Sequence, residues 1–247
     1  MSLLDQKISA WGGPFCALTF GGGLLLAGFV PPPPPTLDAS HVAALYQANA
    51  GMIRIGMILG LFGIAGYMSL VGVISVQLSR IQGISRLAPY LQLGAGAIGV
   101  LTVMFPTMIF AIAAFRPERD PALTQLLNDV GWLIIIPAFP TFIVQFGGFA
   151  AGVLQDNSAT PVFPRWSGFF NIWMAVLFVP GGFSFCFLTG PFAWNGLFAY
   201  WVAAGAFFVW LLVMSWLTLR AIAQEERGLK MADRQAGLTV SQPGIKA

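Results

Sequence analysis

The sequence has few charged residues and almost no residues that bind metals. Lysine and arginine number 12 and aspartate and glutamate 9, so charged residues fill 9% of the 247 positions. A soluble domain carries about 25%. With 57% hydrophobic residues and a mean hydropathy of +0.79, the chain could not cover its surface in water. We therefore expect an integral membrane protein with lipid as its solvent.

The scarcity of histidine and cysteine limits the chemistry of the chain. His41 is the only histidine, and Cys16 and Cys186 are the only cysteines. Metal sites need clusters of histidine, cysteine or carboxylate. With one histidine, we expect neither a catalytic triad nor a multi-histidine metal or haem site from this chain alone. We expect no metal, no cofactor and no catalysis by this chain alone. Without a basic patch interleaved with aromatics, we also expect no nucleic-acid partner.

Six apolar segments are long enough to cross a bilayer, which takes about 20 residues per helix. They cover residues 13–30, 53–78, 89–115, 131–154, 167–188 and 195–221. The predicted fold is therefore an all-α, six-transmembrane-helix bundle over residues 1–222. Residues 223–247 are expected to form a cytoplasmic C-terminal helix and a disordered tail.

The distribution of basic residues predicts the orientation, because lysine and arginine are enriched in cytoplasmic loops. With the N-terminus inside, the cytoplasmic side holds Lys7, Arg80, Arg86, Arg165, Arg220, Arg227, Lys230, Arg234 and Lys246. The outer loops hold only Arg116 and Arg119, with Arg54 near the outer boundary. We expect both termini in the cytoplasm and location in a bacterial inner membrane.

Five consecutive prolines, residues 31–35, follow the first segment. As polyproline II they would extend about 15 Å, carrying the chain away from helix one. Asp38 or Ser40 then provides an N-cap for a helix that starts above the membrane. A solvated PxxP ligand for a partner domain is the alternative interpretation.

A second such start is predicted before the fourth segment. Asp120 is a natural N-cap and Pro121 a natural first helical residue, so this helix can also begin outside the membrane. Two projecting helices would form a small outward helical cap. The alternative is a short interfacial helix with a break near Gly131.

Three polar residues are candidate ligand contacts, since ionisable groups within membranes often mark functional sites. Arg54 and Asp129 are predicted at a similar height near the outer boundary, where they could form a pair. Arg54 could instead be a snorkelling anchor. Gln145 is the most deeply placed large polar side chain, and an interhelical hydrogen bond is its alternative role.

Four prolines, Pro106, Pro137, Pro140 and Pro180, map to the outer half of three successive segments. Each removes a helical hydrogen bond and favours a kink. Kinks at matched depth would open an outward-facing crevice, although membrane helices often contain proline without one. Its candidate lining includes Phe105, Phe142 and Trp173, which suits a lipid, sterol, quinone or hydrocarbon but equally suits plain packing against lipid.

Close helix contacts are expected at Gly56 and Gly60 and at Gly148 and Gly152, which have GxxxG spacing. Besides the bilayer, we expect other membrane subunits or self-association through these faces. The predicted function is that of a non-catalytic structural or accessory subunit of a larger membrane complex, or of a binder of an apolar ligand in the crevice. The alternative is a stand-alone carrier or channel for a small or amphipathic solute.

Overall fold

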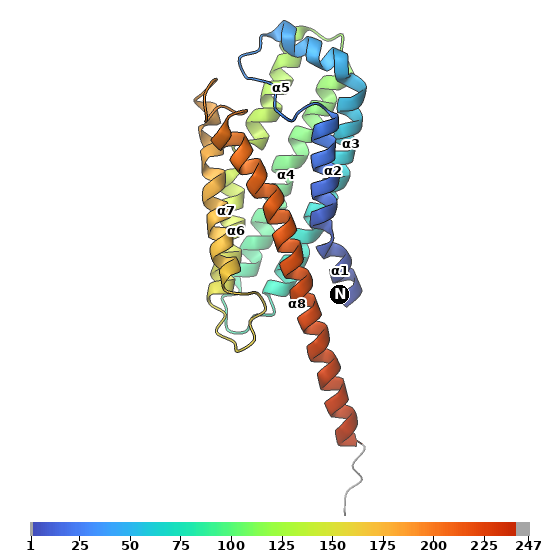
Figure 1. Cartoon of the computed structure of the whole chain (residues 1–247), viewed down its shortest axis with the longest axis vertical. Helices are drawn as coiled ribbons and strands as arrows, with labels where there is room; N and C mark the ends of the chain where they lie inside the picture. Colours follow the sequence, from blue (N-terminus) through green and yellow to red (C-terminus); the bar gives the residue numbers. More distant parts are fainter. Residues whose placement is uncertain (1, 241–247) are drawn as a thin grey trace, which may run out of the picture.

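The computed structural model describes residues 2–240, and side chains for residues 2–232, and it is all-helical with no strands over that range. The chain forms, in order, α1 (Leu3–Ala10), α2 (Gly12–Leu26), α3 (Ala39–Leu78), α4 (Leu87–Phe115), α5 (Pro121–Ile135), α6 (Phe139–Leu154), α7 (Trp166–Phe178), the 3₁₀ helix η1 (Val179–Phe185), the π-helix η2 (Leu197–Val202) and α8 (Ala203–Val240). Figure 1 shows these helices side by side in one elongated bundle.

Six helical stretches among the described residues are long and apolar enough to cross a membrane, which confirms the predicted number. They are Leu3–Leu26, Ala39–Leu78, Leu87–Phe115, Pro121–Leu154, Trp166–Phe185 and Leu197–Ala232. The first stretch differs most from its predicted bounds, because α1 and α2 are separated only by Trp11 and the helix begins ten residues early, at Leu3 rather than residue 13.

Aspartate residues cap the starts of α3 and α5. The carboxylate of Asp38 accepts hydrogen bonds from the backbone N–H of His41, at 3.0 Å, and from the Ser40 hydroxyl, at 2.6 Å. The Ser40 hydrogen bond, with that of the His41 N–H, holds the pKa of Asp38 well below its usual range. Asp120 likewise accepts from the Ala122 N–H at 2.8 Å. Both predicted N-caps, Asp38 and Asp120, are confirmed.

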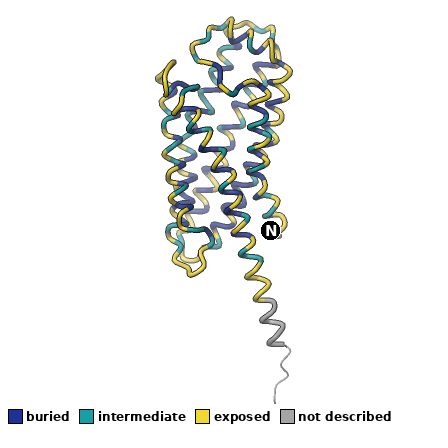
Figure 2. Tube along the Cα trace, in the orientation of Figure 1, coloured by how far each residue is buried: buried dark blue, intermediate teal, exposed yellow. Residues whose placement is uncertain are grey.

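The helices pack in a closed sequence around a buried core. α2 lies against α3, α3 against α4, and α4 against α5 and α6. α6 then packs on α7, and α8 closes the bundle by contacting α7 and α1 to α3. In Figure 1 α8 crosses the bundle obliquely and continues beyond it, and Figure 2 shows the buried residues facing the interior.

Glycine pairs set the closest helix contacts. A Cβ added at Gly56 would collide with the carbonyl oxygen of Gly23, and one added at Gly23 would collide with that of Gly56. A Cβ added at Gly148 would lie 2.9 Å from the Leu91 Cβ and 3.0 Å from the Gln92 backbone nitrogen. The predicted glycine faces therefore join α3 to α2 and α6 to α4 within one chain, because only glycine permits this backbone approach. This corrects their prediction as surfaces for another chain.

Gly60 and Gly152 complete those faces and are also buried. A Cβ on Gly60 would meet the Phe20 ring at 3.2 Å, and one on Gly152 would meet Leu78 at 2.9 Å. Both contacts are again with helices of the same chain.

The proline run lies against the protein rather than in solvent. Pro32 and Pro33 are buried, and the Trp194 indole N–H donates to the Pro33 carbonyl at 2.8 Å. The Gln125 amide donates to the Leu37 carbonyl at 3.0 Å. These contacts join the α2–α3 connection to the hairpin between η1 and η2 and to α5. They contradict a fully solvated PxxP ligand.

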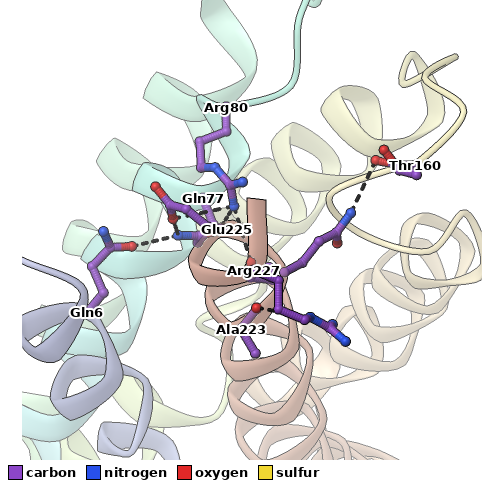
Figure 3. Close-up of polar contacts among 9 residues, drawn as sticks. Gln6, Gln77, Arg80, Thr160, Ala223, Glu225 and Arg227 are labelled. Carbon is purple, nitrogen blue, oxygen red and sulfur yellow. Dashed lines mark hydrogen bonds and ion pairs between the residues drawn. The ribbon is translucent and has the colours of Figure 1, made fainter. Parts of the chain in front are cut away.

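A polar cluster holds α8 where it leaves the bundle (Figure 3). The buried Gln77 amide donates to Gln6 at 2.6 Å and to Glu225 at 2.9 Å. Arg80 forms an ion pair with Glu225 at 3.4 Å, and Lys7 forms one with Glu226 at 2.7 Å. The cluster therefore ties α8 to α1 and to the end of α3.

The C-terminal helix is longer than predicted. α8 runs without interruption through Val240, so residues 238–240 of the expected disordered tail are helical. The remainder of that tail, residues 241–247, lies outside the described residues.

Candidate functional site: an apolar cavity with a lateral groove

Three interruptions of regular α-helix occur toward the end of the bundle that holds the proline run. α5 and α6 are separated at residues 136–138, where Pro137 lies. α7 narrows into η1 at Pro180, and α8 is preceded by the π-helix η2. Proline explains the first two, since it supplies no N–H for the helical ladder. In lipid, such backbone is stable only where protein or a cavity covers it.

The interrupted segments contact one another. A Cβ on Gly181 would collide with the carbonyl oxygen of Ile136, and one on Gly182 would lie 2.6 Å from the Phe139 ring. η1 can therefore approach the α5–α6 break because glycine occupies both positions. On the other side of the break, the rings of Trp132 and Tyr200 are 6.1 Å apart and bring η2 to α5.

These segments surround a cavity of about 70 Å³. Its lining is almost wholly apolar and comes from α2, α4, α5, α6, α7, η2 and α8. The lining residues are Phe20, Leu24, Val103, Trp132, Ile135, Ile136, Phe142, Phe178, Ala199, Tyr200, Ala203, Ala204, Phe207 and Phe208. A cavity of about 150 Å³ holds one benzene, so this one suits the end of a chain better than a ring system.

A groove of about 510 Å³ between α2 and the η2–α8 segment adjoins the cavity. Both spaces are lined by the same four residues, Leu24, Tyr200, Ala204 and Phe208. A Cβ on Gly21 would lie 3.2 Å from the half-buried Phe208 ring. The groove and the cavity are therefore neighbouring parts of one apolar space, and the Phe208 ring stands between them.

The polar groups of the lining already have partners in the protein. The Tyr200 hydroxyl donates to the Phe29 carbonyl at 3.3 Å, and the Trp132 indole N–H donates to Asn128 at 3.2 Å. What remains toward the cavity is aromatic and aliphatic carbon. Phe142 illustrates this, with its ring 4.4 Å from that of Phe178. The arrangement can hold an apolar group by shape and dispersion.

The predicted lining residues divide into two groups. Phe142 lies in the cavity wall. Phe105 and Trp173 point outward instead, with exposed fractions of 49% and 64%. Their side chains face the region that lipid would occupy, as the alternative interpretation of these aromatics allows. Sequence position gave the depth of each residue, but not the direction of its side chain.

Of the four predicted kinks, Pro106 does not interrupt its helix. It is buried within α4, which is continuous from Leu87 to Phe115. Pro137 lies in the α5–α6 break and Pro140 in the first turn of α6, while Pro180 begins the 3₁₀ segment. The chain remains helical through Gly131, so the break that was the alternative interpretation does occur, but at residues 136–138 rather than near Gly131. It falls at Pro137 because that residue cannot donate to the preceding turn.

Arg54 and Asp129 do not form the predicted pair. The Arg54 side chain donates to the Ala50 carbonyl of its own helix at 3.2 Å, and Asp129 accepts from Asn128 at 3.2 Å. Asn128 and Asp129 are adjacent on α5. Asn128 faces α3, because its Oδ1 accepts a hydrogen bond from the Tyr46 hydroxyl at 3.3 Å. The next residue is rotated by about 100° around the helix, which turns Asp129 aside.

Gln145 lies away from the cavity, between α6, α3 and α4. It is fully buried, and its Oε1 accepts from the Tyr67 hydroxyl at 3.1 Å. Its Nε2 has no hydrogen-bond partner among the described residues. The contact is an interhelical hydrogen bond, which is the alternative role that the sequence suggested.

The residues that sequence reasoning missed come from α2 and α8. Phe20, Leu24, Phe207 and Phe208 line the cavity, yet no proline and no charged residue lies within five positions of any of them in the sequence. One available signal was the absence of any charged residue between Arg165 and Arg220, which indicates an unusually apolar hairpin.

No protein-family model, curated protein or solved structure matches the chain. Among the side chains that the structure describes, no three from histidine, cysteine, aspartate and glutamate lie close enough to hold a metal ion. The geometry of the chain is therefore the basis for a functional proposal.

Proposed function

We propose that the protein binds a long-chain apolar or amphipathic molecule within the membrane, without chemistry of its own. The chain of the ligand lies in the groove between α2 and α8, and its end enters the cavity past Phe208. The observation that supports this proposal is that the cavity and the groove share four lining residues, Leu24, Tyr200, Ala204 and Phe208.

The dimensions favour a flexible chain over a fused ring. The cavity of about 70 Å³ accepts only a few carbon atoms, whereas the groove of about 510 Å³ is open along its length. Gly22 and Gly205 in the groove have no atom within 4 Å of an added Cβ. A lipid acyl chain or the isoprenoid tail of a quinone fits this shape better than a sterol.

Photolabelling tests the proposal. The full chain in lipid nanodiscs is exposed to palmitic acid carrying a diazirine at its terminal carbon, and the labelled peptides are sequenced. We expect labels on cavity residues such as Phe142 and Phe207. Gly205→Trp fills the groove and should reduce this labelling about ten-fold.

Gly94→Trp is the matched control. Gly94 is also a helical glycine with open space at its Cβ, and it lines a separate groove between α4 and α6. It should leave cavity labelling unchanged. Labels scattered evenly over the lipid-facing surface, or equal cavity labelling in Gly205→Trp, would refute the proposal.

A role as a subunit of a larger membrane complex is the second candidate. The hairpin around η1 and η2 supports it through exposed aromatic residues, including Phe183, Phe185 and Phe198, which are 50%, 65% and 42% exposed. Native mass spectrometry after mild detergent extraction counts the partners. A monomer that moves solute across liposomes would instead favour the carrier or channel alternative.

We further propose that both termini face the cytoplasm of a bacterial inner membrane. The connections at the N-terminal end of the bundle contain Arg80, Arg86 and Arg165, which agrees with the preference of lysine and arginine for the cytoplasmic side. α3, with 40 residues, is about 60 Å long against a hydrocarbon core of about 30 Å. Its excess length, beside the start of α5, supports an outward cap.

The two native cysteines provide the test of orientation. Cys186 is exposed in the opposite end of the bundle, whereas Cys16 is buried. A membrane-impermeant maleimide should label Cys186 in intact spheroplasts and should not label Cys186→Ser. Labelling only after the membrane is broken would reverse the proposed topology.

A further inference from the structure

A second groove, unrelated to the cavity, runs between α3 and α4 at the N-terminal end of the bundle. Two neighbouring hollows form it, of about 450 and about 430 Å³. Both are lined by Ser79, Pro89 and Tyr90, so they are continuous. The first hollow extends along the helices toward Ser69, and the second extends into the α3–α4 connection as far as Arg86.

The two ends of this groove differ in chemistry. The end in the connection holds the Arg86 guanidinium and the Tyr90 phenol, which is 70% exposed. The rest of the groove is walled mainly by Val73, Val76 and Leu93, with Ser9 and Ser69 at its far end. One charged end and one apolar end match an amphipathic molecule with a negatively charged head.

Arg86 has no partner of opposite charge among the side chains that the structure describes. None of the ion pairs or side-chain hydrogen bonds among the described residues involves it, whereas nearby Arg80 is paired with Glu225. The first turn of α4, which begins directly after Arg86, contains no acidic residue. The positive charge at this end of the groove is therefore not neutralised from within the described chain.

The apolar part of the groove has the length of one lipid leaflet. Ser69 and Ser79, which lie at its two ends on α3, are about 15 Å apart at 1.5 Å per residue. Half of a hydrocarbon core of about 30 Å is the same length. The floor offers room for a chain, since an added Cβ on Gly72 meets no atom within 4 Å.

Hydroxyl groups line the groove close to the charged end. The Ser79 hydroxyl donates to the Ser75 carbonyl at 2.8 Å, and the Ser75 hydroxyl donates to the Pro89 carbonyl at 3.1 Å. The Ser79 oxygen keeps lone pairs that can accept a hydrogen bond from a glycerol head group, whereas the buried Ser75 hydroxyl is also in contact with the Gln92 side chain. The Tyr90 phenol has the amphipathic character typical of residues at the membrane interface.

We infer that this groove binds an anionic phospholipid, with the phosphate at Arg86 and one acyl chain between α3 and α4. The Arg86 guanidinium and the phosphate form a charge-assisted contact. The acyl chain extends past Gly72 toward Ser69. The site is independent of the cavity between α2 and α8, because the two share no lining residue.

Native mass spectrometry of the full chain tests this inference. The protein is titrated in detergent with phosphatidylglycerol and, separately, with phosphatidylcholine of the same acyl chains. We expect phosphatidylglycerol to bind more tightly, and Arg86→Gln to weaken it five- to ten-fold, as expected for the loss of one basic residue next to an anionic lipid. Gly72→Phe blocks the apolar part and should weaken both lipids.

Arg165→Gln is the matched control for the charge. Arg165 is likewise exposed, lies at the same end of the bundle and directly precedes a helix, α7, but it lines neither hollow. It should leave phosphatidylglycerol affinity unchanged. Equal losses in Arg86→Gln and Arg165→Gln, or equal affinity of the wild type for the two lipids, would overturn the inference. So would displacement of the lipid by millimolar inorganic phosphate, since that would make the acyl chain dispensable.

Discussion

Gly56→Ala tests most directly how the bundle is held together. The added methyl group would collide with the backbone carbonyl of Gly23 in α2, and no flexible side chain lies there to move aside. The two helices must therefore separate. Overpacking of this kind costs about 1–3 kcal/mol, against a gain of up to about 1 kcal/mol from replacing a helical glycine with alanine.

Gly51→Ala separates these two effects. Gly51 is on the same helix, α3, but an added Cβ there meets no atom within 4 Å. It should therefore show only the propensity gain. If overpacking prevails, Gly56→Ala lowers the free energy of unfolding while Gly51→Ala raises it slightly. The propensity gain is common to both variants, so they differ by the overpacking cost of about 1–3 kcal/mol.

Reversible unfolding in mixed micelles with increasing dodecyl sulfate measures both values. Helix content from circular dichroism and tryptophan fluorescence should change together if unfolding is two-state. A Gly56→Ala variant as stable as Gly51→Ala would refute the close contact between α2 and α3.

Three further predictions concern polar groups. Gln145→Leu should lower the free energy of unfolding by about 0.6–2 kcal/mol through the lost interhelical hydrogen bond, with the diazirine labelling of the cavity unchanged. Gln77→Met should cost about 1–3 kcal/mol, because it leaves the buried Gln6 acceptor without its donor and leaves Glu225 with Arg80 alone. Hydrogen exchange should then increase at the adjacent part of α8. Asp38 has a lowered pKa in the folded protein, so its contribution to stability is present above about pH 4 and is lost as the pH falls further. A carboxyl NMR titration should show the lowered pKa of Asp38. Ser40→Ala should move this pKa toward its usual range.

Each of these predictions has an outcome that contradicts it. Loss of cavity labelling in Gln145→Leu would place that residue in the ligand site. Unchanged exchange in α8 of Gln77→Met would mean that the polar cluster does not hold the helix. An ordinary Asp38 pKa in the wild type would remove the hydrogen bonds assigned to its carboxylate.

Hydropathy and capping chemistry predicted the coarse fold well. The six apolar segments stand out because a lipid-spanning helix needs an unbroken apolar length, and Asp120 before Pro121 marks a helix start by local chemistry alone. Apolar segments and helix caps depend only on residues that are close together in the sequence, so the residue types alone are sufficient to recognise them.

The cavity could not be predicted in the same way, because it depends on which faces of distant helices meet. Phe142 and Trp173 are both aromatic and similarly deep, yet one is 2% exposed and the other 64%. In a uniformly apolar segment, periodicity gives little information on the inward face. The GxxxG spacing identified Gly56 and Gly148 as positions of close helix contact, because close backbone approach requires glycine. The spacing does not identify the partner helix.

The place of α8 in the bundle has a consequence for biosynthesis. α2 leaves the ribosome before α3 to α7, whereas α8, which forms the opposite wall of the lateral groove, leaves after them. The face of α2 around Gly21 and Gly22 therefore cannot pack against α8 until four intervening spans are inserted. Until then, lipid or a membrane chaperone covers it. The cavity and the groove form only after α8 has been made, and a chain truncated before residue 203 would insert five spans without forming either space.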